Sequence, residues 1–573
     1  YYGGLTWFNN KLQIKYKNIG NFEKTGQAWN GIVAGNSDAS LMDQGIKTYQ
    51  DMWNHGLGRF NSLYEGLVFD KVSKKFPQDA NGNFQTARYS LDDGSLWNRT
   101  TDNFYQNHNI ASLQWRPSAH WTHNAAIHYT YGYGYYREFR PDKKFAKFGM
   151  YATDAAGTMV KLSDFVRRKG LSQHTYGLLY NTNYVNGQWD VIAGLNLQHF
   201  KGSHFGYVDY ISTRTGYTHI EKPYAGNRYY DSDASKNDYS LFAKANYHIT
   251  EQWDIFGDVQ YRLVRYKTSG INDQFTKISA APYFKNQALD INRTFSFLNP
   301  KAGISFHQGG HKGYFSVACA NREPERNNFT DNGSEPAPKA ERLFDYEMGY
   351  SYAAQNWHVS LNLYYMDYHN QFVQTGKKSD IGEYLTTNIP LSHRLGAEIS
   401  ADYSPLSWLT IAGNAALSQN KIEDFTEYAE DWGAASGFRT IHYDRSTLAF
   451  SPSAIVNGFI TARWKGLTAT WHTNFVSRQF LDNTQNNDRS LPSFSQSNFS
   501  ANYAFNNIKC CGLKALTLGL NLNNVFNRHY AASGWVYSAY RHATDLDTDP
   551  RYYQIGFVPM AGFNMMGNIT LTF

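Results

Sequence analysis

Residues 562–573 read GFNMMGNITLTF and alternate between two kinds of side chain. The odd positions from Phe563 to Phe573 are apolar except for Gly567, whereas the even positions are polar except for Met566. Successive side chains of a β-strand point to opposite faces. The stretch therefore predicts a strand with one apolar and one polar face, and its meaning depends on which solvent touches the apolar face.

The same alternation recurs along the chain. Residues 357–365 read WHVSLNLYY and residues 516–522 read LTLGLNL, each with an apolar side chain at every second position. Residues 189–197, WDVIAGLNL, do the same apart from Ile192. Patterns with the helical spacing i, i+3, i+4 are scarce by comparison. The sequence therefore predicts an all-β protein.

The composition narrows the class of protein. The 573 residues include 17% aromatics, with 44 Tyr, 37 Phe and 14 Trp. The mean hydropathy is nevertheless only −0.58, and no apolar run approaches the roughly 18 residues that a membrane helix needs. A water-soluble protein fits these values. An outer-membrane β-barrel fits them too, because its apolar surface is diluted by a polar lumen and polar loops.

The charges, cysteines and motifs exclude several kinds of site. The net charge is +6, from 54 basic and 48 acidic residues without a basic block, so nucleic acid is not an expected partner. Cys510 and Cys511 are adjacent and cannot form an ordinary disulfide, and with Cys319 they provide no CxxC pair for zinc. The sequence contains no Walker, HExxH or GxSxG motif. We therefore expect no enzyme activity, no bound metal and no cofactor.

The connections between the alternating segments are of two kinds. Short polar turns lie near residues 117–118, 186–187, 251–252, 309–310, 355–356, 405–406, 465–466 and 513–514. Long irregular stretches lie at about residues 139–173, 207–236, 428–452 and 534–559. Short periplasmic turns at one end and long extracellular loops at the other are typical of a transmembrane antiparallel β-barrel, and the segments from Leu12 to Phe573 amount to about eighteen strands.

Aromatic residues gather beside the short turns. The tryptophans that closely follow a turn are Trp121, Trp189, Trp253, Trp357 and Trp408, and the aromatics that close the preceding strands are Trp115, Tyr184, Tyr247, Tyr352 and Tyr403. Indole and phenol rings prefer the level of lipid headgroups, so the pattern predicts a membrane girdle. The alternative, an aromatic core in a soluble β-sandwich or propeller, would place such rings in mid-strand. Residues 128–136, HYTYGYGYY, would supply part of the opposite belt.

A lipid environment also explains the end of the chain. In hydrocarbon every backbone amide must be paired and no strand edge can stay open. We therefore expect the last strand to close onto the first, with Phe573 at the periplasmic interface.

Four motifs carry a family resemblance. They are TGQAWNG at 25–31, ANREPERNNFTD at 320–331, ERLFDYEMGY at 341–350 and NNVFNRHY at 523–530, together with the terminal Phe573. Over essentially its whole length the chain resembles the barrel of a TonB-dependent outer-membrane receptor, of the kind common in Bacteroidetes. The resemblance implies a 22-stranded barrel around a plugged lumen, about four strands more than counted here.

The missing strands have two explanations. The chain opens with YYGG and without methionine, and no plug domain is visible in it. Residues 1–573 are therefore expected to be an N-terminally truncated barrel domain that lacks the plug and the first strands. The competing explanation is a closed barrel of fewer strands.

The resemblance implies active import across the cell outer membrane of a Gram-negative bacterium, which the chain would cross many times. The implied partners are TonB with its inner-membrane energising complex, the outer-membrane lipid, an imported ligand, and a surface lipoprotein as a further candidate. A ferric siderophore or other iron complex is the expected ligand, with haem or cobalamin as alternatives. Two other classes stay open: a passive porin, and a secreted β-protein such as a carbohydrate-binding module or glycosidase.

Candidate ligand contacts are Arg, Tyr and Trp of the long loops, because ferric siderophores are often anionic and aromatic. They are Trp29, Arg167, Arg168, Arg228, Tyr229, Tyr230, Trp535, Tyr540 and Arg541. The alternative is that these side chains pack the loops against each other. A second group surrounds Pro324, which should interrupt strand pairing, and is expected to face the lumen or plug: Arg322, Glu323, Glu325 and Arg326. For these residues an ion-pair network that stiffens the wall is the alternative.

Two weaker candidates complete the set. Asp545, Asp547 and Asp549 alternate as calcium ligands would, but the stretch lacks the Gly and the distal Glu of an EF-hand loop and reads more simply as a solvated acidic loop. Histidines near the strand tops could ligate haem iron, although none lies in a distinguishing motif. They are His199, His204, His529 and His542.

Overall fold

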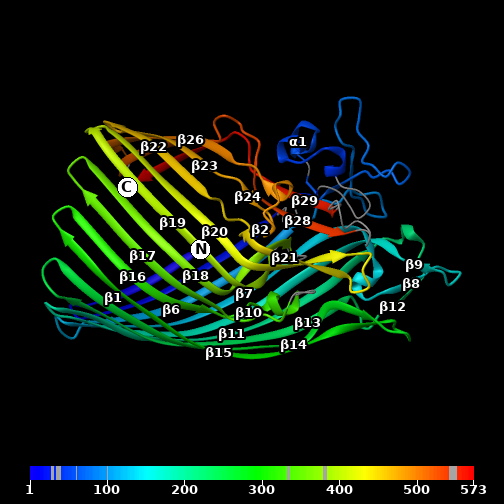
Figure 1. The fold of residues 1–573 in the computed structure, drawn as a ribbon, viewed down its shortest axis with the longest axis horizontal. Helices are drawn as coiled ribbons and strands as arrows, with labels where there is room; N and C mark the ends of the chain where they lie inside the picture. The colour runs from blue at the N-terminus through cyan, green and yellow to red at the C-terminus, as the bar shows by residue number, and fades with distance from the viewer. Residues whose placement is uncertain are drawn as a thin grey trace.

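A single antiparallel sheet forms the wall of the molecule. The structure is a computed structural model that describes residues 1–26, 31–33, 41–59, 61–99, 101–331, 336–378, 384–510, 512–540 and 551–573. These residues form a sheet of 23 strands that curves into a barrel (Figure 1), so the prediction of an all-β antiparallel barrel is confirmed. Within the described residues, no helix combines the length and the apolar character needed to cross a membrane.

The strands of the wall pair with their neighbours in chain order. They are β1 (Tyr2–Phe8), β2 (Leu12–Thr25), β6 (Thr101–Trp115), β7 (Trp121–Lys144), β10 (Leu162–Val185), β11 (Trp189–Ile211), β13 (Arg228–His248), β14 (Trp253–Lys277), β15 (Phe284–Gln308), β16 (His311–Arg322), β17 (Glu341–Ala353), β18 (Trp357–Lys378), β19 (Tyr384–Leu406), β20 (Leu409–Asp431), β22 (Ala454–Trp464), β23 (Leu467–Val476), β26 (Phe494–Cys510), β27 (Leu513–Asn523) and β30 (Asn564–Thr572). The other four strands of the sheet are β3 (Ile32–Val33), β21 (Phe438–Thr447), β28 (Ala531–Tyr540) and β29 (Arg551–Pro559). Without these four, 19 described strands make up the wall. This is one strand more than the expected count of about eighteen, because that count began at Leu12 and β1 precedes it.

The two ends of the series are β1 and β30. Strand β30 pairs with β27 over Ala515–Asn523, and β1 pairs with β2. Among the described residues no pairing joins β1 to β30. Closure of the barrel at Phe573 and a total of 22 strands therefore stay predictions, as does the division into a barrel and a separate plug.

One end of the wall carries tight turns and the other carries long loops (Figure 1). The loops contain the helices α1 (Tyr49–Asn54) and α2 (Arg326–Thr330), and the 3-10 turns η1 (Leu41–Gln44), η2 (Leu57–Arg59), η3 (Phe145–Phe148), η4 (Thr213–Thr215) and η5 (Asn487–Arg489). They also contain small sheets made by β4 (Glu65–Leu67) with β5 (Thr86–Arg88), by β8 (Tyr151–Thr153) with β9 (Met159–Val160) and β12 (His219–Glu221), and by β24 (Gln479–Phe480) with β25 (Ser490–Leu491).

The buried apolar clusters lie among the loops. The largest joins Leu41 and Met52 of the first long loop to Leu481, Ile555 and Phe557. These side chains bind the loop onto the β28–β29 hairpin, since burying apolar surface is the dominant favourable contribution to packing. The loops therefore form a packed cap over one end of the barrel.

The apolar side chains of the wall are exposed. All five turn-side tryptophans, Trp121, Trp189, Trp253, Trp357 and Trp408, are between 41% and 45% exposed. Four of them contact the aromatic ring of a neighbouring strand in a tilted arrangement, as Trp121 does with Tyr184 at 4.8 Å between ring centroids. The rings thus lie at strand ends and outside any core, and their contact with lipid stays a prediction.

Candidate functional site

A cavity of about 1060 Å³ opens inside the barrel at the loop end. Neighbouring strands supply its wall in register, because Glu23 pairs with Phe104, Asp102 with Tyr136, and Tyr136 with Lys169. Tyr136 lies on an even position of β7, opposite in parity to the exposed odd positions that begin with Trp121. The cavity is therefore lined by the inward face of the alternating strands.

Three cations reach this cavity. They are Lys147 of η3, Lys169 of β10 and Arg326 of α2. Lys169 forms an ion pair with Asp273 of β14, with 2.5 Å between Nζ and Oδ2, and its Nζ lies 5.5 Å from the centre of the Tyr230 ring. Arg326 donates from Nη2 to the Ser232 hydroxyl at 3.2 Å. Its buried Nε has no hydrogen-bond partner within the described part of the chain.

Aromatic rings line the same cavity as the cations. The aromatic residues of the lining include Phe104, Tyr136, Phe200, Tyr230, Tyr266 and Phe329. Tyr266 and Phe329 stack with 6.3 Å between ring centroids and 20° between planes. The lining also contains five acidic residues, which are Glu23, Asp102, Asp273, Glu325 and Asp331, so its charge is mixed. Cations beside flat rings can still bind the negative groups of an aromatic ligand. The arrangement holds such a ligand without covalent chemistry.

The four candidate residues around Pro324 lie in different surroundings in the structure. Glu325 and Arg326 line the cavity. Glu323 is 7% exposed and lies in the wall, where its carboxylate accepts from Lys236 Nζ at 2.6 Å and from Arg262 Nη1 at 2.7 Å. Arg322 is exposed and pairs with Glu341 at 3.0 Å. The wall network expected as the alternative thus holds Glu323, and contact of any of the four residues with a plug stays a prediction.

Of the ligand candidates, Tyr230 lines the cavity. Two others are enclosed by protein. Arg167 is 3% exposed and its Nε lies 2.5 Å from Oε1 of Glu138. Tyr229 is packed against the ring of Phe148. Both side chains therefore contact protein, as expected from the alternative in which the candidates pack the loops against each other.

Arg168 and Arg228 lie on the other side of the wall. Arg168 is on an even position of β10, in the same parity as the exposed Leu178, and pairs with Asp209 at 3.4 Å. Arg228 pairs with Asp231 at 2.8 Å. Side chains on this face point away from the lumen, so they lie outside the cavity.

The last candidates belong to the β28–β29 hairpin. Tyr540 is buried between two guanidinium groups, with Arg439 at 4.0 Å and Arg551 at 4.9 Å from its ring centre. Trp535 is half-buried against Gly556, where an added Cβ would lie 2.0 Å from the indole nitrogen. Both pack the hairpin. Trp29, Arg541, His542 and the aspartates at 545, 547 and 549 lie outside the described residues.

The histidines have different surroundings. His204 lines the cavity with Lys169 and Arg326. His199 borders an outward groove, and His529 stacks on Trp53 with 3.6 Å between ring centroids. Sequence reasoning missed Lys147, Lys169 and Tyr136. Lys169 and Tyr136 could have been identified from the sequence, because they occupy inward-facing alternate positions of β10 and β7 when these strands are followed from the girdle towards the loops.

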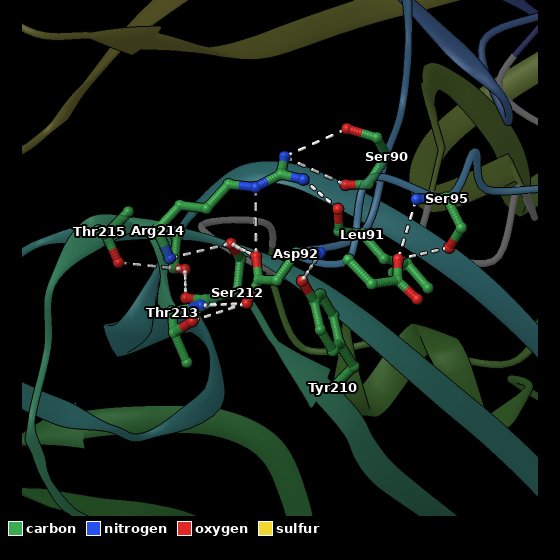
Figure 2. Close-up of polar contacts among 11 residues, drawn as sticks. Ser90, Leu91, Asp92, Ser95, Tyr210, Ser212, Thr213, Arg214 and Thr215 are labelled. Carbon is green, nitrogen blue, oxygen red and sulfur yellow. Dashed lines mark hydrogen bonds and ion pairs between the residues drawn. The ribbon is translucent and has the colours of Figure 1, made fainter.

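The carboxylate of Asp92 fixes the first long loop to the barrel (Figure 2). Asp92 accepts hydrogen bonds from the hydroxyl of Ser212, at 2.6 Å, and from the backbone and hydroxyl of Thr213, at 2.7 and 2.8 Å. Its backbone amide donates to the Tyr210 hydroxyl at 3.0 Å, and Arg214 reaches back to Ser90, Leu91 and Asp92. Burial acts to raise the pKa of Asp92, but the hydrogen bonds it accepts outweigh burial and lower the pKa.

Comparison with known proteins gives one family and a set of folds. The family described as "TonB dependent receptor-like, beta-barrel" matches residues 22–525. No curated protein matches the sequence. The chain is similar in structure to the siderophore receptor PiuA from Acinetobacter baumannii, with a TM-score of 0.60 and 13% identity, over 99% of this chain and 74% of that one.

Two further solved structures have the same fold. The ferric-catecholate import receptor Fiu from E. coli K12 gives a TM-score of 0.59 at 11% identity, over 98% of this chain and 72% of that one. The ferric yersiniabactin uptake receptor FyuA from Yersinia pestis gives 0.57 at 11% identity, over 98% and 68%. At these identities the likeness describes the fold.

Proposed function

The chain belongs to the TonB-dependent receptor-like β-barrel family, and we propose that it imports a scarce iron chelate, a ferric siderophore above all, across the outer membrane. It is a receptor and transporter and not an enzyme. TonB and its inner-membrane complex supply the energy. The ligand binds from outside and is released to the periplasm when the receptor changes state, so the requirement is differential affinity between the two states.

The lumenal cavity carries this proposal. Lys147, Lys169 and Arg326 offer positive charge, while Tyr230 and Tyr266 offer flat rings. An anionic chelate would replace Asp273 as the partner of Lys169 or bind beside it. Charge-assisted hydrogen bonds of this kind contribute about 1.5–3 kcal/mol each.

The names of the similar structures support an iron chelate as the ligand. They are described as a siderophore receptor, a ferric-catecholate import receptor and a ferric yersiniabactin uptake receptor. Those substrates belong to those proteins. The expected plug domain would complete the site from below, and a surface lipoprotein could cover it from above.

One observation favours haem as a second candidate. His204 lies in the same cavity lining as Tyr230, and an imidazole or a phenol oxygen can bind haem iron. Haem also carries two carboxylates, for which Lys169 and Arg326 are suitable partners.

Growth on single iron sources tests the proposal. A deletion strain is supplied in turn with ferric catecholates, ferric hydroxamates, haem and free iron, and is complemented with the wild type, with Lys169→Ala combined with Arg326→Ala, or with Lys71→Ala. Lys71 is an exposed loop lysine away from the cavity and serves as the matched control. We expect the double variant to bind its chelate about 10–100-fold more weakly, since 1.4 kcal/mol corresponds to a factor of ten. A strain that fails only on haem would transfer the proposal to haem. Cobalamin uptake is measured in parallel, and its loss with normal growth on every iron source would refute an iron substrate.

A further inference from the structure

The outward face of the barrel carries an unexplained groove. It holds about 600 Å³ and crosses β2, β6, β7, β10, β11 and β13. Ile127 pairs with Leu178, and Leu178 pairs with Leu197, so three apolar side chains form one row across three strands. All three are exposed. Because they share the parity of Trp121 and Trp189, they lie on the face that the family places against lipid.

Amphipathic rings border this groove on the side of the loops. Tyr129, Tyr176 and His199 line it there. The Tyr129 hydroxyl lies 2.9 Å from Nδ1 of His174, and Nδ1 of His199 lies 2.7 Å from the side-chain oxygen of Asn237. Rings with one apolar and one polar end settle where hydrocarbon meets headgroups.

Three cations lie immediately beyond these rings. Lys201 pairs in register with Ser235, and Ser235 pairs with Lys267, which places both lysines in one row. Arg265 is two residues before Lys267 on the same face of β14, and all three side chains are exposed. Within the described residues none of the three has a hydrogen bond or ion pair. The nearest outward acids in the register are Asp233 and Asp290, which pair with Ser269 from either side, one row further from the membrane.

The height of these cations matches the membrane boundary. Trp189 and Lys201 are twelve positions apart on β11, and Trp253 and Arg265 are twelve apart on β14. A strand rises about 3.3 Å per residue and tilts by about 45°, so twelve residues span about 28 Å of membrane depth. The apolar band of such barrels is about 25 Å tall. The cations therefore lie just outside the hydrocarbon, at the level of outer-leaflet headgroups.

We propose that this face is a binding site for a phosphorylated, acylated glycolipid of the outer leaflet. Acyl chains lie in the groove, and headgroup phosphates bind Lys201, Arg265 and Lys267. Lysine provides a point charge for phosphate, and arginine a planar fork. A free anion would use the cations without the groove, and a neutral lipid would use the groove without the cations. The site depends on the outer-membrane location but not on the identity of the imported chelate.

The outward arginines further up the wall already have carboxylate partners. Arg137 and Arg168 both pair with Asp209, at 3.0 and 3.4 Å, and Arg228 pairs with Asp231. Arg168 also lies over the ring of Tyr207, 4.7 Å from its centre. These arginines lie above the headgroup level and each has a carboxylate partner, whereas Lys201, Arg265 and Lys267 have none within the described residues and are free to bind a phosphate.

Lipid binding to the full chain in detergent micelles tests the proposal. Native mass spectrometry or a titration measures the affinity for lipid A with its phosphates, for the same lipid after phosphatase treatment, and for inorganic phosphate. The patch variant combines Lys201→Gln, Arg265→Gln and Lys267→Gln. The control variant combines Lys11→Gln, Lys312→Gln and Lys465→Gln, three exposed lysines at the turn end. Ala111→Trp fills the groove without changing charge.

We expect lipid A to bind at least about tenfold more tightly than its dephosphorylated form. The patch variant should lose at least tenfold in affinity for lipid A, Ala111→Trp should weaken both lipids, and the control should bind like the wild type. The proposal is overturned if the patch variant binds lipid A normally, if removal of the phosphates has no effect, or if inorganic phosphate displaces the lipid and Ala111→Trp changes nothing. Growth on the iron source is measured in parallel. Its loss in the deletion strain tests import, whereas lipid affinity tests this site.

Discussion

The Ser212 hydroxyl donates a 2.6 Å hydrogen bond to Oδ1 of Asp92, although the two residues are 120 positions apart in the sequence. The bond ties the first long loop to the turn after β11. Two further hydrogen bonds, from the backbone and the hydroxyl of Thr213, give this carboxylate three donors in total. At this point the cap over the barrel mouth is therefore held by one carboxylate with three donors.

Replacing Asp92 with Asn should release this loop. Hydrogen bonds to charged groups contribute about 1.5–3 kcal/mol each, so local opening around residues 86–97 should become at least about tenfold more frequent. Hydrogen exchange of that segment measures the change. Asp93→Asn is the matched control, because the Asp93 side chain accepts only from Ser95 of its own turn among the described residues. Equal exchange in the two variants would contradict the anchor.

The anchor should also resist mild acid. The pKa of Asp92 is lowered in the folded protein, because the donors from Ser212, Thr213 and Tyr210 outweigh burial. A lowered pKa means that the stabilisation is complete above the unfolded value of about 4 and is lost as the pH falls through the lower folded value. Proteolysis of the loop by an acid-active protease should therefore begin only well below pH 4. If the pKa of Asp92 were not lowered in the folded protein, its titration would not change the stability of the anchor, so cleavage that does not rise at any pH below 4 would contradict the prediction.

Glu323→Gln should destabilise the barrel wall. The change leaves Lys236 and Arg262 without their shared carboxylate. Breaking a fully buried pair costs about 3–5 kcal/mol, and less is expected here because Lys236 is 37% exposed. The temperature at which the folded barrel is lost on unboiled gels should fall. Arg322→Gln removes an exposed partner of Glu341 and should cost at most about 1 kcal/mol; a larger effect at Arg322 than at Glu323 would invert the ranking.

The turn-side tryptophans should be quenched by lipid. In bilayers of lipids brominated along the acyl chain, Trp121, Trp189, Trp253, Trp357 and Trp408 should be quenched most by bromines near the headgroup end. Trp253→Phe should reduce the quenched fraction of the fluorescence and keep the ring contact with Phe306. Trp53→Phe is the control, because Trp53 stacks on His529 in the loop cap. If Trp53→Phe lowered the quenched fraction as much as Trp253→Phe does, the result would argue against the girdle.

The sequence was sufficient for the barrel because strand alternation is a local property. A residue's face follows from its parity within the strand, so the outward position of Trp189 and the inward position of Tyr136 can both be read without a structure. The tight turns and long loops were also recognised from their composition. The comparison with the TonB-dependent receptor family over residues 22–525 agrees with that prediction.

The candidate site was predicted less well. Arg167 and Arg168 are consecutive, yet a strand sends them to opposite faces, so one pairs with Glu138 inside and the other with Asp209 outside. The two residues share their type and their position near a loop, and only their parity distinguishes them.

What the sequence determined by itself was the period of two, and with it the fold class and the division of each strand into an apolar and a polar face. Only the tertiary structure decided that Lys169 of β10 meets Asp273 of β14, and that Asp92 meets Ser212. Such contacts depend on the register of many strands and on how the loops pack over them. These are long-range properties, because the pairing of two strands fixes the position of the next strand around the barrel. No single segment of the sequence determines the positions of all the strands.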